Sequence, residues 1–189
     1  MNNSLFPVAK ACAVFAPVLL LAGDLFHLAR SGSVLWTILL WLAFVLFLPA
    51  LAGLVIAIHV RSPAIAIAGG IFALIGTLAG ASMQSFFRAL IVLRSASYGD
   101  AATFLASHSM IAPTILAPGI FFPIGLLVLS GGIFHARVAP VWVAATLAIG
   151  AALFPIGHAA EVGWALVTGD LLLLAAFCGI AKFSLPPTA

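Results

Sequence analysis

Residues 34–58 read VLWTILLWLAFVLFLPALAGLVIAI, a run without a single charged side chain. The hydrocarbon core of a bilayer is about 30 Å thick and takes roughly 20 apolar residues per helical crossing, so this run is long enough to span it. The whole chain has the same character, because 65% of its 189 residues are hydrophobic and 6% are charged. Soluble domains carry about a quarter charged residues. The sequence therefore predicts an integral membrane protein.

Apolar runs long enough to cross the membrane recur along the chain. They cover residues 11–29, 34–58, 63–93, 113–134, 139–158 and 162–183. The long connection 94–112 contains an apolar stretch too short to span, interrupted by Ser107, His108 and Ser109, which is typical of an interfacial helix. We therefore expect an all-α polytopic bundle of about six transmembrane helices, built as one domain over residues 1–189, with a short interfacial helix on the outer side.

The cations divide unevenly between the two sides of this topology. On the side of the termini lie Lys10, Arg61, Arg137 and Lys182. On the other side lie Arg30 and Arg94. Because cytoplasmic loops of membrane proteins are enriched in Lys and Arg, both termini are predicted to be cytoplasmic in a multi-pass protein of the cell membrane.

The composition also limits the expected partners. The net charge of +3 comes from charges scattered singly, without the basic runs that nucleic-acid binding needs. Cys12 and Cys178 fall inside hydrophobic runs, where a small apolar packing role is expected rather than a disulfide. The expected partners are membrane lipid and either a second copy of the chain or a larger membrane complex. Small-residue faces such as that of Gly76 and Gly80 would form such contacts.

Ionisable residues inside a membrane are costly and usually face the bundle interior, so they are candidates for a functional site. Asp24 and His27 stand three residues apart near the outer end of the first run, and His158 and Glu161 do so in the fifth. Side chains at this spacing share a helix face. We therefore expect each acid to orient the imidazole beside it. In an enzyme, His158 oriented by Glu161 would be the general base.

Gln84 and Arg88 form a further polar edge, four residues apart on the third run. Arg88 cannot lose its charge, so it needs a carboxylate, a carbonyl or a ligand anion beside it. Asp24, Glu161 or Asp170, the most deeply placed acid, would be its structural partner. In a functional site Arg88 would instead clamp an anion, and as a catalytic group it would stabilise developing negative charge.

These residues predict one outward-facing site, covered by the interfacial helix that carries His108. Its expected lining consists of Asp24, His27, Gln84, Arg88, His108, His158, Glu161 and Asp170. A different interpretation makes His27 and His158 ligands of a divalent metal or a haem. A second haem would then use His59 and His135 at the inner side.

The stretch Phe122-Pro123-Ile124-Gly125-Leu126 is followed by His135-Ala136-Arg137, Pro140 and Trp142. This succession of a helix entry with proline and glycine, a short basic turn and a proline-started helix resembles a pattern in small bacterial six-span integral membrane proteins of unknown function. The resemblance implies the six-span topology, a bacterial source and the cell inner membrane. It brings no catalytic motif with it.

Three functions are consistent with these residues. The favoured one is a polar pocket that binds or transforms a lipophilic or anionic small molecule. The second is a non-catalytic subunit of a larger membrane complex, whose outer polar residues pair with one another and leave no cavity. The third is electron transfer through a bound haem or metal. The chain has no phosphate-binding loop, nucleophile elbow, His-Glu-x-x-His run or Cys-x-x-Cys pair, so no reaction class is indicated.

Overall fold

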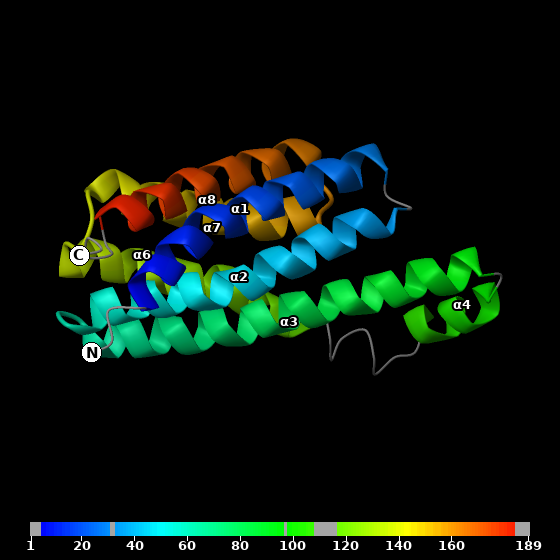
Figure 1. Cartoon of the computed structure of the whole chain (residues 1–189), viewed down its shortest axis with the longest axis horizontal. Coiled ribbons are helices and arrows are strands. Elements are labelled where there is room, and N and C mark those ends of the chain that lie inside the picture. Colours follow the sequence, from blue (N-terminus) through cyan, green and yellow to red (C-terminus); the bar gives the residue numbers. More distant parts are fainter. Residues whose placement is uncertain (1–4, 31–32, 97, 108–116, 184–189) are drawn as a thin grey trace.

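The computed structural model describes residues 5–30, 33–96, 98–107 and 117–183, and every regular element in these ranges is helical. The elements are α1 (Leu5–Ala29), α2 (Val34–His59), α3 (Pro63–Ser95), α4 (Gly99–Ser107), the 3-10 helix η1 (Ala117–Ile120), α6 (Phe121–Ala136), α7 (Val141–Ala159) and α8 (Gly163–Phe183) (Figure 1). Six segments are long and apolar enough to cross a membrane: α1, α2, α3, η1 with α6, α7 and α8. The predicted all-α bundle of six spans is confirmed.

Local sequence sets several helix ends. The Ser33 hydroxyl accepts the Leu35 N–H at 3.2 Å and so caps the start of α2. Pro63 opens α3, in the first turn, where its missing N–H is not needed. Arg137 ends α6 in the left-handed conformation with φ 51°, and Pro140 then leads into α7. These short connections make consecutive helices antiparallel.

The six spanning helices form a closed ring in the order α1, α2, α3, α6, α7 and α8, with α8 packed against α1. Helix α1 begins and α8 ends at the same end of the bundle (Figure 1). We call this the basic end, because it carries His59, Arg61, His135, Arg137 and Lys182. The opposite end is called the acidic end, because the acidic residues of the chain lie nearer to it: Asp24, Asp100, Glu161 and Asp170.

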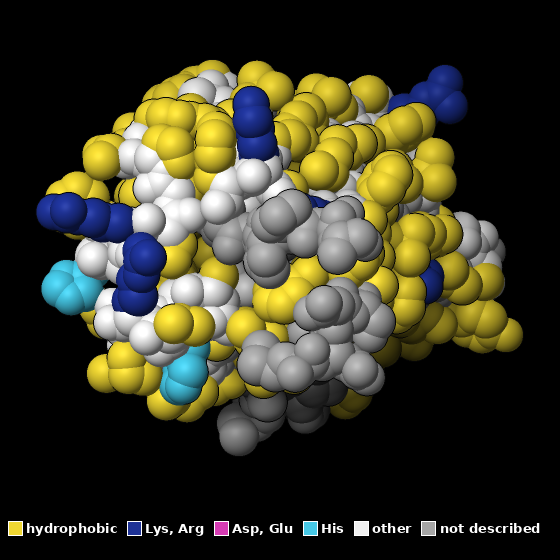
Figure 2. Space-filling view, turned by 60° about the vertical axis from the view of Figure 1, so that its left-hand side comes forward, with side chains coloured by type: hydrophobic (Ala, Val, Ile, Leu, Met, Phe, Trp, Pro, Cys, Tyr) yellow, Lys and Arg dark blue, Asp and Glu magenta, His cyan; other side chains and the backbone are white. Residues whose placement is uncertain are grey.

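The two ends differ chemically. Figure 2, which brings the basic end forward, shows Lys, Arg and His side chains and no Asp or Glu. There Arg61 Nη1 donates to the carbonyl oxygen of Ala136 at 2.8 Å. That carbonyl is among the last ones of α6, which have no partner within the helix. The cations predicted to share a side are therefore together, while the cytoplasmic placement of that side stays a prediction.

Helix α3 is longer than a bilayer crossing requires. Its 33 residues extend for about 50 Å at 1.5 Å per residue. The excess projects from the acidic end, where α4 packs beside it (Figure 1). Helix α4 lies within the connection for which a short additional helix was predicted.

Phenylalanine rings from four helices fill the middle of the bundle. Phe122 of α6 contacts Phe44 and Phe47 of α2 and Phe154 of α7, and Phe47 contacts Phe177 of α8. The ring centroids lie 5.0 to 5.5 Å apart in these pairs, the usual range for tilted and edge-to-face contacts. All five rings of this phenylalanine layer are buried. It separates the acidic half of the interior from the basic half.

Glycines bring α3 and α6 into backbone contact. Gly76 of α3 lies against the backbone of Phe122, and Gly125 of α6 lies against the backbone of Ala73. Side chains larger than hydrogen would hold the helices apart. Gly80, on the same face of α3, packs on α2. The small-residue face predicted on the third run is thus used within the chain.

Candidate functional site

The buried polar side chains of the acidic half lack partners that such groups normally have. Asp24, Gln84 and Asp170 are exposed by 1%, 2% and 1%. Among the described residues, the buried side-chain atoms without a hydrogen bond are Asp24 Oδ2, His27 Nδ1, Gln84 Oε1, Arg88 Nε and Nη2, both Asp170 carboxyl oxygens and, at the basic end, Ser62 Oγ. Because buried polar atoms are nearly always paired, their concentration at one end marks a candidate site. We call the polar side chains of this half the polar cluster: Asp24, His27, Gln84, Arg88, His158 and Asp170.

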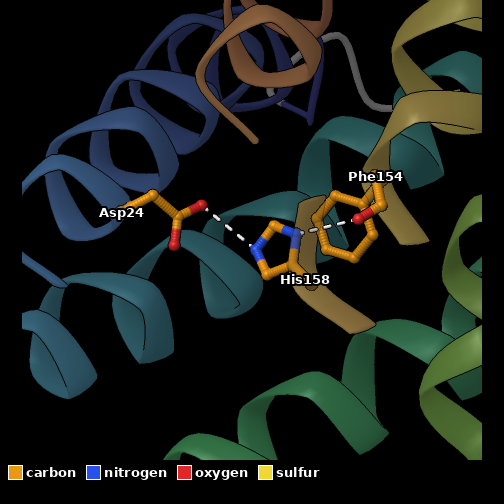
Figure 3. A network of polar contacts seen from close by, with 3 residues as sticks. All are labelled: Asp24, Phe154 and His158. Carbon is orange, nitrogen blue, oxygen red and sulfur yellow. Dashed lines mark hydrogen bonds and ion pairs between the residues drawn. The ribbon is translucent and has the colours of Figure 1, made fainter. Parts of the chain in front are cut away.

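His158 of α7 joins the polar cluster through contacts at both ring nitrogens (Figure 3). Its Nδ1 lies 3.0 Å from the carbonyl oxygen of Phe154, one turn earlier in α7. Its Nε2 lies 3.1 Å from Asp24 Oδ2 of α1, the distance of an ion pair but without the alignment of a hydrogen bond. The imidazole also stacks on the Phe154 ring, with centroids 4.0 Å apart. These contacts fix the position and the plane of the imidazole.

The geometry around His158 determines where its protons lie. A carbonyl oxygen can only accept, so Nδ1 must carry a proton to bond Phe154. In the neutral ring Nε2 then presents a lone pair to Asp24 Oδ2, and an ionised carboxylate there would be repelled. The two side chains must therefore hold one further proton. It lies either on Nε2, which gives an imidazolium–carboxylate pair, or on Asp24.

Asp170 of α8 is a second buried acid of this half, and it is exposed by 1%. Neither of its carboxyl oxygens has a hydrogen-bond partner among the described residues, which is costly in an apolar interior. His158, Asp24 and Asp170 thus place ionisable groups of α7, α1 and α8 in the interior of the acidic half.

Gln84 lies at the same depth as Asp24. Gly80 of α3 packs on Phe44 of α2, and Gln84 and Leu40 each lie one turn nearer the acidic end than these two residues. Leu40 is also the residue that Gly23, the neighbour of Asp24, packs against. The amide and the carboxyl groups therefore occupy one layer, on the acidic side of the phenylalanine layer.

Arg88 lies one turn beyond Gln84 on α3, nearer the acidic end. Its guanidinium carbon lies 6.0 Å from the centre of the Trp41 ring of α2, within the range of a cation–π contact. Its Nε and Nη2 are buried and have no hydrogen-bond partner among the residues that the structure describes. These two nitrogens form the edge with which arginine binds carboxylate or phosphate in a bidentate manner. The predicted internal carboxylate partner is not found for this edge.

Aromatic side chains surround the α1–α2 side of the acidic end. The His27 ring lies 4.4 Å from that of Trp36, and Trp36 lies 6.0 Å from Phe87, the neighbour of Arg88. Trp36 and Trp41 were not among the predicted site residues. A signal was present, because both indoles lie in the apolar run 34–58, in its half nearer the acidic end.

Two predicted site residues stand apart from this arrangement. Glu161 is exposed in the turn between α7 and α8, with φ 54°. Because α7 ends at Ala159, Glu161 no longer continues the helix face of His158. His108 lies outside the described residues. Among those that are described, no group of three or more His, Cys, Asp or Glu is placed to hold a metal ion.

The fold and the polar cluster define a class: a multi-pass membrane protein with buried polar residues gathered in one half of its helix bundle. Comparisons with models of protein families, with curated proteins and with solved structures found no match for this chain. Its function is therefore inferred from the polar cluster.

Proposed function

We propose that this integral membrane protein binds the anionic group of a small amphiphilic molecule at the acidic end, with Arg88 as the anion clamp. The observation that carries the proposal is the buried, unpartnered Nε and Nη2 edge of Arg88. Arg88 is half-buried, and its guanidinium stays charged at any physiological pH, so the two buried nitrogens without an acceptor are destabilising. A ligand carboxylate or phosphate would remove this penalty.

Among the described residues, no acid is paired with Arg88. Asp24 lies against His158, Glu161 is exposed in a turn, and both carboxyl oxygens of Asp170 are unpartnered. The carboxylate that the sequence suggested for Arg88 is therefore supplied by the ligand in this proposal. Gln84, one turn deeper, would bind a second polar atom of the same group.

Binding is favoured over catalysis by the state of His158. Both of its ring nitrogens have contacts, one with the Phe154 carbonyl and one with Asp24. A general base needs a free nitrogen within reach of the substrate proton. His158 in this arrangement supports the site and does not present a base to it.

A non-catalytic subunit was expected to have its outer polar residues paired with one another. Among the described residues, the one ion pair is that of Asp24 with His158. Gln84 and Arg88, by contrast, keep unpartnered atoms. The glycine face that would dock a partner is already packed against α2 and α6. These observations favour the binding function over the subunit function.

The proposal is tested with dodecanoate and its uncharged methyl ester, titrated calorimetrically into the protein in a neutral detergent. Dodecanoate is expected to bind and the ester is not. Arg88→Gln is expected to weaken binding at least about tenfold, since a charge-assisted bidentate contact exceeds the 1.4 kcal/mol that corresponds to a factor of ten. Arg88→Lys should restore part of the affinity, because lysine keeps the charge without the planar edge.

The matched control is Arg94→Gln, which removes an exposed arginine from the last turn of the same helix. It should leave dodecanoate binding unchanged. Equal affinities of the wild-type protein and Arg88→Gln would refute the proposed function.

A further inference from the structure

An apolar groove runs along the outer surface between α2 and α3 and leads toward Arg88. Its part nearer the basic end has a volume of about 320 Å³ and its part nearer the acidic end about 270 Å³. Leu48 lines both parts, so the two depressions adjoin along α2, and together they are called the groove. On α2 the groove extends from Val55 to Trp41, which is about 21 Å at 1.5 Å per residue. This exceeds half of the roughly 30 Å hydrocarbon core.

The hydroxyl groups in the groove wall are already satisfied. Thr77 donates to the Ala73 carbonyl at 2.6 Å, and Ser82 donates to the Leu78 carbonyl at 2.9 Å. Ser85 makes the same kind of bond one turn back in α3, at 3.2 Å. The hydroxyl groups of the wall therefore present no unpaired donor. Apart from them and the Trp41 indole the lining is apolar, so an unbranched hydrocarbon chain suits it better than a polar molecule.

Arg88 lies just beyond the acidic end of the groove and is not part of its lining. Trp41 lines the groove and also lies under the Arg88 guanidinium, 6.0 Å from its central carbon. Ser85 lines the groove from α3, and Arg88 follows it by less than one turn. An open apolar groove with a guanidinium next to its end is complementary to a long chain with a terminal carboxylate.

We propose that the α2–α3 groove holds the chain of a long-chain fatty acid whose carboxylate binds Arg88. This inference rests on the proposed function and names its ligand class. The occupant enters sideways from the bilayer, because exposed residues such as Ala52 and Ser82 line the groove on its lipid side.

The test is photolabelling with palmitate that carries a diazirine in the middle of its chain, using the full-length protein in nanodiscs of zwitterionic lipid. Labels located by peptide mass spectrometry are expected on groove residues such as Leu48, Leu51 and Leu74. Unlabelled palmitate should compete, and methyl palmitate should not. Labelling is expected to fall at least about tenfold in Arg88→Gln, the factor expected for dodecanoate.

Filling the groove gives an independent measurement. Ala52→Phe places a ring in the groove at an exposed position, and Ala152→Phe makes the same change at an exposed position of α7. Groove labelling should be lost in the first variant and retained in the second. If Ala52→Phe fails to fold, the position of the labels in the wild-type protein still shows whether the fatty-acid chain occupies the groove.

The outcomes separate the two proposals. Labels spread over all lipid-facing helices, together with Arg88-dependent binding of dodecanoate, overturn the groove inference and leave the proposed function standing. If labelling in the groove persists in Arg88→Gln, the molecule in the groove is not held by its carboxylate at Arg88, and the inference is overturned. Binding and labelling that are both independent of Arg88 overturn both proposals.

Discussion

Gly125→Ala in α6 is expected to destabilise the bundle by about 3 kcal/mol, the upper end of the range for inserting a methyl group into a packed core. The added Cβ would overlap the backbone nitrogen and Cα of Ala73 in α3. A backbone cannot rotate away as a side chain can, so the two helices would have to separate. Unfolding of the purified protein by titration with sodium dodecyl sulfate measures the change.

The control is Gly131→Ala in the same helix. Its Cβ would meet nothing within 4 Å, and alanine is favoured over glycine in a helix by roughly 0.5 to 1 kcal/mol. Gly131→Ala should therefore be neutral or stabilising. If Gly125→Ala were as stable as Gly131→Ala, the close crossing of α3 and α6 would be wrong.

This crossing also bears on the polar cluster. Gly76 and Gly125 fix the height of α6 along α3, and this places Phe122 in the phenylalanine layer. The layer lies directly beneath the polar residues of the acidic half. A helix shift caused by Gly125→Ala should therefore weaken dodecanoate binding as well as stability.

The spans could be predicted because hydropathy alone selects them. The predicted run 34–58 matches α2 to within a residue, and the starts of the runs at 63 and 162 match α3 and α8 equally well. The first helix begins earlier than predicted, at Leu5. The predicted run starts after Lys10, because hydropathy marks only the apolar part of a helix, whereas α1 itself continues past this charged residue.

The partners within the site could not be predicted in the same way. Spacing along one helix places Asp24 beside His27 and His158 beside Glu161, whereas the structure pairs Asp24 with His158 across α1 and α7. Which face of a helix turns inward depends on its rotation. In lipid, hydropathy does not fix that rotation when both faces are apolar. The prediction identified the residues but not their contacts.

Arg88 shows the same limit of sequence-based prediction, here for a contact that was expected and is missing. The sequence predicts that Arg88, inside a membrane, needs a carboxylate, a carbonyl or a ligand anion beside it, and the acids of the chain are few enough to name. Among the described residues, none of these acids reaches the buried Nε and Nη2 of Arg88. This result depends on the three-dimensional positions of the helices that carry the acids, which the sequence does not give. The absence of this expected contact is what suggests a ligand.

His158→Ala is expected to destabilise the protein by about 3 to 5 kcal/mol, the usual effect of removing one member of a buried ion pair. It leaves the buried carboxyl group of Asp24 without its contact to His158. The exposed His135 at the basic end provides the control, and His135→Ala should change stability by less than about 0.5 kcal/mol. Unfolding by sodium dodecyl sulfate again supplies the measurement.

Asp24→Ala combined with His158→Ala should cost less than the sum of the two single changes, because the second change removes the group that the first leaves unpaired. Asp24→Asn should cost less than Asp24→Ala, since the amide can donate to Nε2 of a neutral His158 that keeps its Nδ1 proton on the Phe154 carbonyl. If instead the asparagine variant were as unstable as the alanine variant, the amide would be no substitute for the carboxyl group, which favours an imidazolium–carboxylate pair. Strict additivity of the single changes would mean that the 3.1 Å contact of Asp24 with His158 contributes nothing to stability.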